Sequence, residues 1–180
     1  VIIDPTHHED GQKMSVENDI VGAPQSLVRY LMKYINGLNE RPYETEARPI
    51  FDENNYLEFL EENGSLLNYV KFHFVVPNMW NTSGNLDKEL KETGNDTGTE
   101  EVDMTFKSRR GLRGDAKRVF DGVEYASRGA GYVRARSVTG KSFNSNLHPV
   151  QTTVETSESD AENGSDNWIS QFWKKILGRE

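Results

Sequence analysis

The segment YVKFHFVV, residues 69–76, is the strongest strand signal in this chain of 180 residues. Aromatic and β-branched side chains fill the segment. Pro77 follows it and closes the pattern, since proline lacks the N–H group that a sheet ladder needs. We expect this strand to lie centrally in a sheet.

Helix and strand patterns on both sides of this segment define the expected fold. Apolar residues recur at helical spacing between Pro24 and Gly37, and Asp52 can serve as the N-cap of a second helix that runs to Glu62. A third helix is expected over 115–126. Two helical turns are expected over 86–90, and short strands over 1–3, 102–106, 132–138 and 150–154. The pattern predicts an α+β fold, with a mixed or antiparallel sheet of about five strands covered by three helices.

The C-terminal residues differ in composition from the rest of the chain. Residues 155–167 (ETSESDAENGSDN) predict a flexible acidic linker, which sets residues 1–154 apart as one α+β domain. Residues 168–180 predict an amphipathic helix. It could dock onto its own domain, bind a protein partner or another copy of the chain, or lie on a membrane surface. Its candidate partner-binding residues are Trp168, Ile169, Phe172, Trp173 and Ile176.

The composition excludes several classes of protein. The chain has no cysteine, which excludes disulfides and thiolate metal sites. No apolar run approaches the ~18 residues that span a bilayer, and the first residues lack the pattern of a signal peptide. On these grounds the chain, which has 28% charged residues and a net charge of -8, is interpreted as a cytoplasmic protein.

Positive charge is concentrated in one block of the chain. Residues 1–106 contain 8 Lys/Arg against 20 Asp/Glu, whereas residues 107–149 contain 10 against 3. Most of the cations in this basic block are arginines, whose planar guanidinium groups bind phosphate oxygens in pairs. The candidate nucleic-acid-binding residues are Arg109, Arg110, Arg113, Lys117, Arg118, Arg128, Tyr132, Arg134, Arg136 and Lys141.

Strand alternation predicts how part of the basic block is arranged. Tyr132, Arg134 and Arg136 fall on one face, where the ring could stack on a base while the guanidinium groups hold phosphates. Arg109, Arg110 and Arg113 are expected in the loop before the third helix, where they would add positive charge.

Neutralisation within the protein is the alternative interpretation of the same block. The cations could pair across the fold with carboxylates of the acidic first half, and such surface pairs need no ligand. The net charge of -8 argues against indiscriminate nucleic-acid binding, although it permits a local patch. The expected partners on this interpretation include Glu53, Glu58, Glu61 and Glu62.

Two glycine-containing motifs resemble phosphate-binding loops. Residues 135–142 (ARSVTGKS) fit a relaxed phosphate-binding loop, but the strand before them carries Arg134, and Pro149 leaves little room for the required helix. We therefore expect a hairpin turn there. Residues 129–131 (GAG) lack the helix that must follow a dinucleotide fingerprint, and we expect them to turn the chain into the next strand.

A cluster of oxygen and imidazole donors follows the first expected strand. Asp4, His7, His8 and Asp10 could hold a divalent metal ion that activates water against a phosphodiester. This would make the chain a metal-dependent nuclease or phosphoesterase. The alternative is a solvated polar loop without a ligand. No other cofactor and no catalytic residue set is indicated.

Residues 71–80 (KFHFVVPNMW) and 125–136 (YASRGAGYVRAR), with the turn at 139–141 and the FNS sequence at 143–145, carry a resemblance to other proteins. In these stretches the chain resembles uncharacterised bacterial proteins encoded near mobile elements and phage-defence genes. The resemblance implies a context of foreign nucleic acid. Our leading hypothesis is a nucleic-acid- or polyanion-binding subunit of a bacterial assembly, such as a phage-defence assembly. The alternatives are the metal-dependent enzyme and a protein-interaction module that acts through its C-terminal helix.

Overall fold

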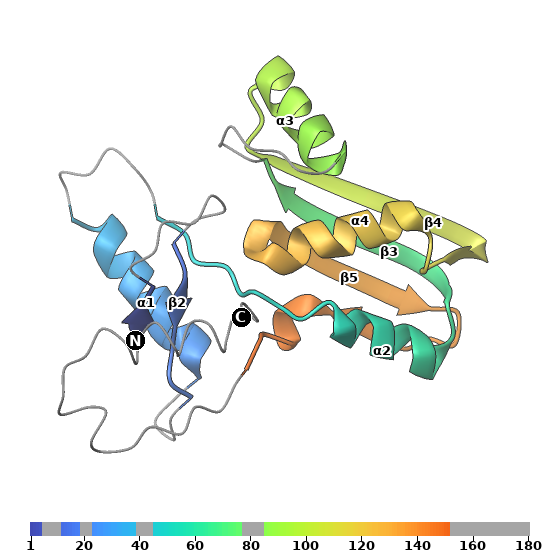
Figure 1. Cartoon of the computed structure of the whole chain (residues 1–180), viewed down its shortest axis with the longest axis horizontal. Coiled ribbons are helices and arrows are strands. Elements are labelled where there is room, and N and C mark those ends of the chain that lie inside the picture. Colours follow the sequence, from blue (N-terminus) through green and yellow to red (C-terminus); the bar gives the residue numbers. More distant parts are fainter. Residues whose placement is uncertain (5–11, 19–22, 39–44, 77–84, 152–180) are drawn as a thin grey trace. The chain divides into compact units, whose positions relative to one another are not determined.

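The computed structural model describes residues 1–4, 12–18, 23–38, 45–76 and 85–151 (Figure 1). The chain divides into two compact units, one of residues 46–150 and the other of residues 1–45 with 151–180. Among the described residues, no helix has both the length and the apolar character needed to cross a membrane.

A four-stranded antiparallel sheet forms the centre of the larger unit. Its strands are β3 (Leu66–Val75), β4 (Glu101–Arg113), β5 (Gly131–Ser137) and β6 (Ser142–Asn144), in the order β4-β3-β5-β6. The segment of residues 69–76 forms most of β3 and pairs with a strand on each side. Its expected central position is therefore confirmed.

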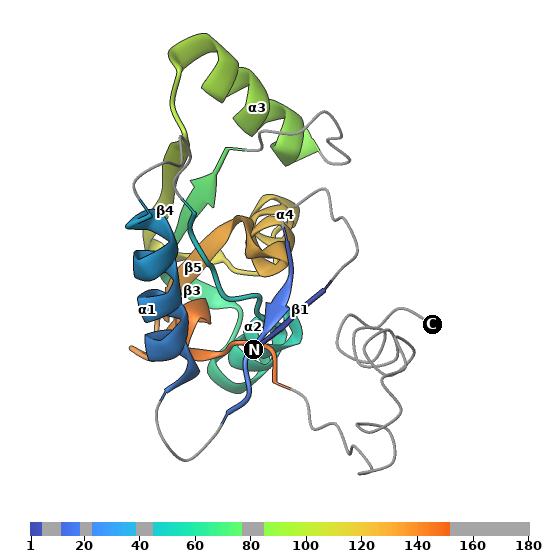
Figure 2. The ribbon, with the colours of Figure 1, turned by 90° about the vertical axis from the view of Figure 1, so that its left-hand side faces the viewer.

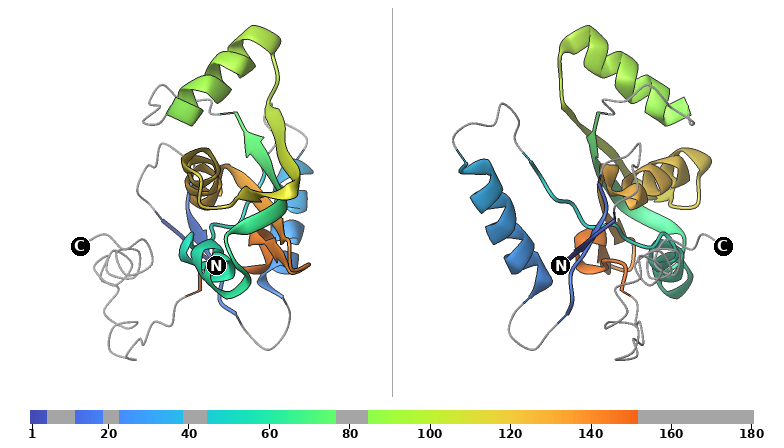
Figure 3. Two further views of the ribbon diagram at one scale, coloured as in Figure 1. Left: turned by 90° about the vertical axis from the view of Figure 1, so that its right-hand side faces the viewer. Right: turned by 60° about the vertical axis from the view of Figure 1, so that its left-hand side comes forward.

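Helices pack on one face of this sheet. They are α2 (Asn54–Asn63), α3 (Asn85–Thr97) and α4 (Lys117–Tyr125), and each contributes buried side chains to the core. Phe72 and Phe74 of β3 are fully buried in the same core. The left panel of Figure 3 shows α2 and α4 on the same side of the sheet. We call the opposite side of the sheet the open face, because no described helix of this unit packs on it.

A large β-bulge interrupts the pairing between β3 and β4. Leu67 lies opposite Leu112, whereas Tyr69 lies opposite Lys107, so that residues 108–111 of β4 face the single residue Asn68. Gly111, at a φ of 89°, turns the strand back into register after the bulge.

The described residues of the smaller unit form a second, two-stranded sheet and one helix. Strands β1 (Ile2–Ile3) and β2 (Met14–Ser15) are antiparallel and run side by side (Figure 2), and α1 spans Pro24–Asn36. The helix expected before Gly37 is confirmed. The strand expected at the N-terminus is present, but it pairs only within this small sheet and Ile3 is 56% exposed.

The fold class is α+β, as the sequence predicts, but its details differ. Four α-helices and two sheets are described, rather than three helices and one sheet, because α3 runs far past the two turns expected for it. Val150 and Gln151 are not in a strand, and the outer strand of the sheet is instead β6. The predicted linker and C-terminal helix lie outside the described residues.

Gly131, at the start of β5, generates the first testable prediction. Its φ is 152°, and a Cβ atom there would lie 1.9 Å from the carbonyl oxygen of His73. We expect Gly131→Ala to lower the free energy of unfolding by about 3 kcal/mol or more, because β5 must move away from β3. Urea denaturation measures this loss. The control is Gly140→Ala, at a φ of 93° with open space around it, which should lose only about 1–2 kcal/mol from backbone strain. Equal losses in the two variants would contradict the close approach.

Two buried tyrosines predict how stability changes at alkaline pH. Burial raises the pKa of Tyr56 and Tyr125 above the ordinary value of 10, with smaller contributions from the charges of Asp115 and Asp87 respectively. The unfolded chain therefore loses these protons first, and the stabilisation that is present below about pH 10 is lost as the pH rises further.

Tyr56→Phe tests this linkage. The Tyr56 hydroxyl donates to the carbonyl oxygen of Gly114 at 3.1 Å, so the variant should lose about 1 kcal/mol near neutral pH. Between about pH 9 and 11 its stability should fall less steeply than that of the unchanged protein. Denaturant midpoints across this range provide the measurement, and parallel pH curves would contradict the prediction.

Candidate nucleic-acid interface

The open face carries its side chains in rows that run across the strands. Directly opposed residues of antiparallel strands point to the same face, so the register assigns the members of each row. One row is Lys107, Tyr69, Arg136 and Ser142, and the next is Thr105, Lys71, Arg134 and Asn144. A third row is Asp103, His73 and Tyr132. The face is therefore basic toward the bulge and acidic at the opposite end, where Glu101 lies opposite Val75.

The face predicted for β5 is present. Val133 and Ala135 are buried, Arg134 and Arg136 are exposed, and Tyr132 is half-buried. This alternation sets the two arginines on the open face, on the side of the sheet away from the helices.

Tyr132 is already engaged within the protein. Its ring stacks on His73 with 4.9 Å between the ring centroids, and the guanidinium carbon of Arg134 lies 5.0 Å from the Tyr132 centroid. The expectation that Tyr132 offers a free surface for a base is therefore not supported by the geometry. The ring instead holds the Arg134 guanidinium by a cation–π contact.

Asp103, at the acidic end of the face, is held by side chains of β3. Its carboxylate accepts a hydrogen bond from the Lys71 ammonium at 2.7 Å and contacts Nδ1 of His73 at 2.9 Å. Glu101 lies 3.6 Å from Nε2 of the same imidazole. The hydrogen bond from Lys71, and to a smaller extent the one from His73, holds the pKa of Asp103 below its ordinary value of 3.8. The ammonium of Lys71 and the imidazole of His73 thus have carboxylate partners on the sheet itself.

Cations of the basic block on and around α4 are also paired. Arg113 contacts Asp115 at 3.2 Å, Lys117 contacts Asp121 at 3.6 Å, Arg118 contacts Glu89 at 2.6 Å, and Arg128 contacts Asp87 at 3.4 Å. Neutralisation within the protein is therefore correct for this part of the block.

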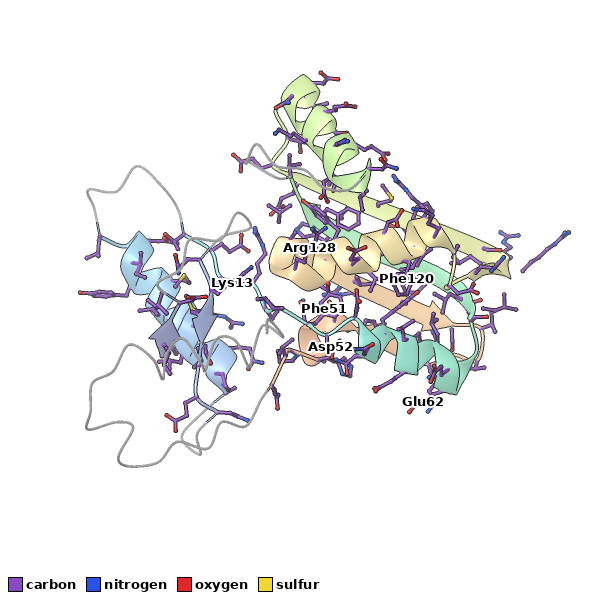
Figure 4. All side chains as sticks on the ribbon, viewed as in Figure 1. Lys13, Phe51, Asp52, Glu62, Phe120 and Arg128 are labelled. Atoms are coloured by element: carbon purple, nitrogen blue, oxygen red, sulfur yellow. The ribbon has the colours of Figure 1, made fainter. Side chains whose placement is uncertain are left out.

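The partners of these cations are not the glutamates that the sequence suggested. Glu53, Glu58, Glu61 and Glu62 form no ion pair with the basic block in the part of the chain that the structure describes. Glu62 lies near the end of α2 and Arg128 lies just beyond the end of α4, in separate regions of the unit (Figure 4). The paired carboxylates come instead from α3, from α4 and from the turn before α4.

The remaining cations of the block have no carboxylate partner among the described residues. Lys107 and Arg136 flank Tyr69 on the open face, and Arg134 contacts the Tyr132 ring. Arg109 and Arg110 are exposed on the bulge of β4, not in the loop before α4, because β4 continues to Arg113. Lys141 follows the β5–β6 turn and is exposed.

The two glycine motifs form turns, as the sequence predicts. Residues 135–142 belong to the β5–β6 hairpin, whose turn is closed by the amide of Ser137 donating to the carbonyl oxygen of Lys141 at 2.9 Å. No helix begins at Lys141, so the arrangement required of a phosphate-binding loop is absent from this described segment. Gly129, at a φ of 88°, turns the chain from α4 into β5.

Two other predicted sites lie mostly outside the described residues. Asp4 is 3% exposed, and its amide donates to the carbonyl oxygen of Lys13, whereas His7, His8 and Asp10 are not described. No group of three or more potential metal ligands occurs among the described residues. The five candidate partner-binding residues from Trp168 to Ile176 also lie outside them.

Three residues of the open face were missed as site candidates by the sequence analysis: Tyr69, Lys71 and Lys107. Alternation within 69–76 assigns Tyr69 and Lys71 to one face, so that signal was available. For Lys107 it was not, because the residue's position opposite Tyr69 depends on the cross-strand register of β4 with β3, which no local pattern encodes.

The Asp103 contacts predict acid sensitivity. A carboxylate with a lowered pKa stabilises the fold above the pKa of the unfolded state, and this stabilisation is lost as the pH falls through the folded-state pKa. Asp103→Asn should therefore flatten the fall of unfolding free energy below about pH 4. Denaturation at a series of acidic pH values measures it. The control is Glu92→Gln, which removes the same formal charge at an exposed position of α3. If both variants change the acid limb equally, the Asp103 network is not its source.

Comparisons with known proteins give no further assignment of the site. No family model, no curated protein and no solved structure matches the chain.

Proposed function

We propose that this protein associates with nucleic acid through the basic end of the open face. Lys107, Arg134 and Arg136 would contact phosphates, with Arg109 and Arg110 of the bulge adding positive charge. The observation that carries this proposal is the division of the basic block. The cations around α4 have carboxylate partners, whereas those on the open face and bulge have none among the described residues.

This division favours a ligand over neutralisation. A protein with a net charge of -8 has ample carboxylates to pair every cation, yet these cations stand together without one on the described surface. Clustered guanidinium groups repel one another, and phosphate oxygens relieve this repulsion while accepting paired hydrogen bonds. The acidic remainder of the protein would confine a polyanion to this end of the sheet.

The resemblance to bacterial proteins encoded near mobile elements suggests a setting. A nucleic-acid-binding subunit of a phage-defence assembly would meet foreign DNA or RNA, and the open face would supply its contact surface. We propose this setting together with the binding activity.

Charge-matched double variants test the proposal. Arg134→Gln/Arg136→Gln removes two positive charges from the open face, and Lys117→Gln/Arg118→Gln removes two from α4. We expect the first variant to weaken binding of labelled single-stranded DNA about tenfold at low salt and to lower the salt slope by about 1.4, because two phosphate contacts are lost. The second should bind nearly as the unchanged protein does. Fluorescence anisotropy across a salt series measures both quantities.

Two results would contradict the proposal. One is equal weakening in the two double variants, which would indicate a diffuse charge effect. The other is the absence of binding to single- and double-stranded DNA and RNA at low salt.

A further inference from the structure

We infer that the ligand of the open face is a single strand, with one base stacked on Tyr69 and flanking phosphates on Lys107 and Arg136. This inference rests on the proposed function and deepens it, since it specifies the form of the nucleic acid and the residue that contacts a base. Tyr69 thereby takes the role of stacking on a base, which was predicted for Tyr132 from the sequence.

Tyr69 is the aromatic residue of the open face that remains available. Its side chain is half-buried, and no ring of a described residue stacks on it. The other aromatic groups of the face, Tyr132 and His73, stack on each other, and Arg134 covers Tyr132. A base entering the face therefore finds its free aromatic surface at Tyr69.

The cations on either side of Tyr69 suit a strand that crosses the sheet. Lys107 lies directly opposite Tyr69 on β4, and Arg136 lies directly opposite it on β5. Neighbouring strands are about 4.8 Å apart, so the Cα atoms of the two cations lie about 10 Å apart with the ring between them. Long side chains on both sides could hold the phosphates before and after a base that stacks on the ring.

The shape of the surface favours single-stranded over duplex ligands. Duplex recognition uses a helix or ribbon that enters a groove, whereas the described open face consists of side chains projecting from a sheet. The bases of a duplex are stacked on one another and cannot reach Tyr69. An unpaired strand can turn a base outward onto an aromatic ring, as in other sheet surfaces that bind single strands.

Charge along the face also limits where the strand can lie. Asp103 and Glu101 occupy the far end of β4 and would repel phosphates there. The Lys107–Tyr69–Arg136 row lies next to the bulge that carries Arg109 and Arg110, which places it at the most basic part of the sheet.

The test combines two substitutions with matched oligonucleotides. Tyr69→Phe retains the ring, and Tyr69→Thr removes it while keeping a residue that favours strands. The probe is fluorescein-labelled oligothymidine of about 12 nucleotides, measured by anisotropy at low salt beside the same backbone with abasic sites and a duplex of equal length. Circular dichroism and urea denaturation establish that both variants are folded.

The expected result is specific to the ring and to the base. Tyr69→Thr should weaken oligothymidine binding about tenfold, and Tyr69→Phe should stay within about twofold. Neither variant should change binding to the abasic backbone or to the duplex, because those ligands present only phosphates to this row. The salt slope for oligothymidine should be the same in all three proteins, since no charge is altered.

The outcomes separate this inference from the proposed function. If Tyr69→Thr binds oligothymidine as tightly as the unchanged protein while the Arg134/Arg136 variant is weakened, the stacking inference fails and phosphate binding stands. The inference is also overturned if Tyr69→Thr weakens the binding of oligothymidine, of the abasic backbone and of the duplex equally. It is overturned as well if polyglutamate displaces the labelled oligothymidine as efficiently as unlabelled oligothymidine does. If none of the oligonucleotides binds, both proposals fail.

Discussion

The packing of α4 onto Phe72 is the contact on which the arrangement of the larger unit depends. Gly122 allows this close approach, since a Cβ atom at that position would lie 2.9 Å from the Phe72 ring. Once Phe72 faces α4, strand alternation turns Lys71 and His73 to the other side of the sheet. The side of β3 that carries Phe72 therefore determines both the core and the open face. If β4 and β5 each shifted by one residue in their pairing with β3, charged side chains of both strands would be buried.

Charge is arranged around this two-sided sheet by the same constraint. Helices on the core side bring carboxylates of their own, so the cations of α4 find partners such as Glu89 and Asp121 nearby. Among the described residues of this unit, the carboxylates on the open face come from β4 itself, and these lie at one end, at Glu101 and Asp103. Cations at the other end are left without partners on the described surface, because no described helix of this unit packs on that side to supply carboxylates. The basic patch thus arises from topology as much as from composition.

Sequence patterns predicted those parts of this arrangement that depend on local spacing. The central strand, the helices at Pro24–Asn36 and Asn54–Asn63, and the exposed arginines of β5 follow from period and alternation. The ion pairs between distant segments could not be predicted, because Arg118 and Glu89 are joined by the packing of α4 beside α3, which no local pattern encodes. The row around Tyr69 could not be predicted either, since the pairing register of β3 with β4 fixes which residue of β4 faces it. The engagement of Tyr132 by His73 and Arg134 depends in the same way on cross-strand register.

An acidic protein can bind a polyanion only if its repulsive charges are kept away from the contact surface. Here the repulsion between a polyanion and the carboxylates of the open face is partly cancelled, since Asp103 is held by Lys71 and His73. The uncancelled cations stand at the opposite end of the same strands, which produces a gradient of charge along β4 from Glu101 to Arg110. A phosphate backbone lying along β4 would meet this gradient, whereas one crossing the strands near Tyr69 would contact only its basic end. The electrostatics of the sheet therefore favour a ligand that runs across the strands, the direction in which Tyr69 lies between two cations.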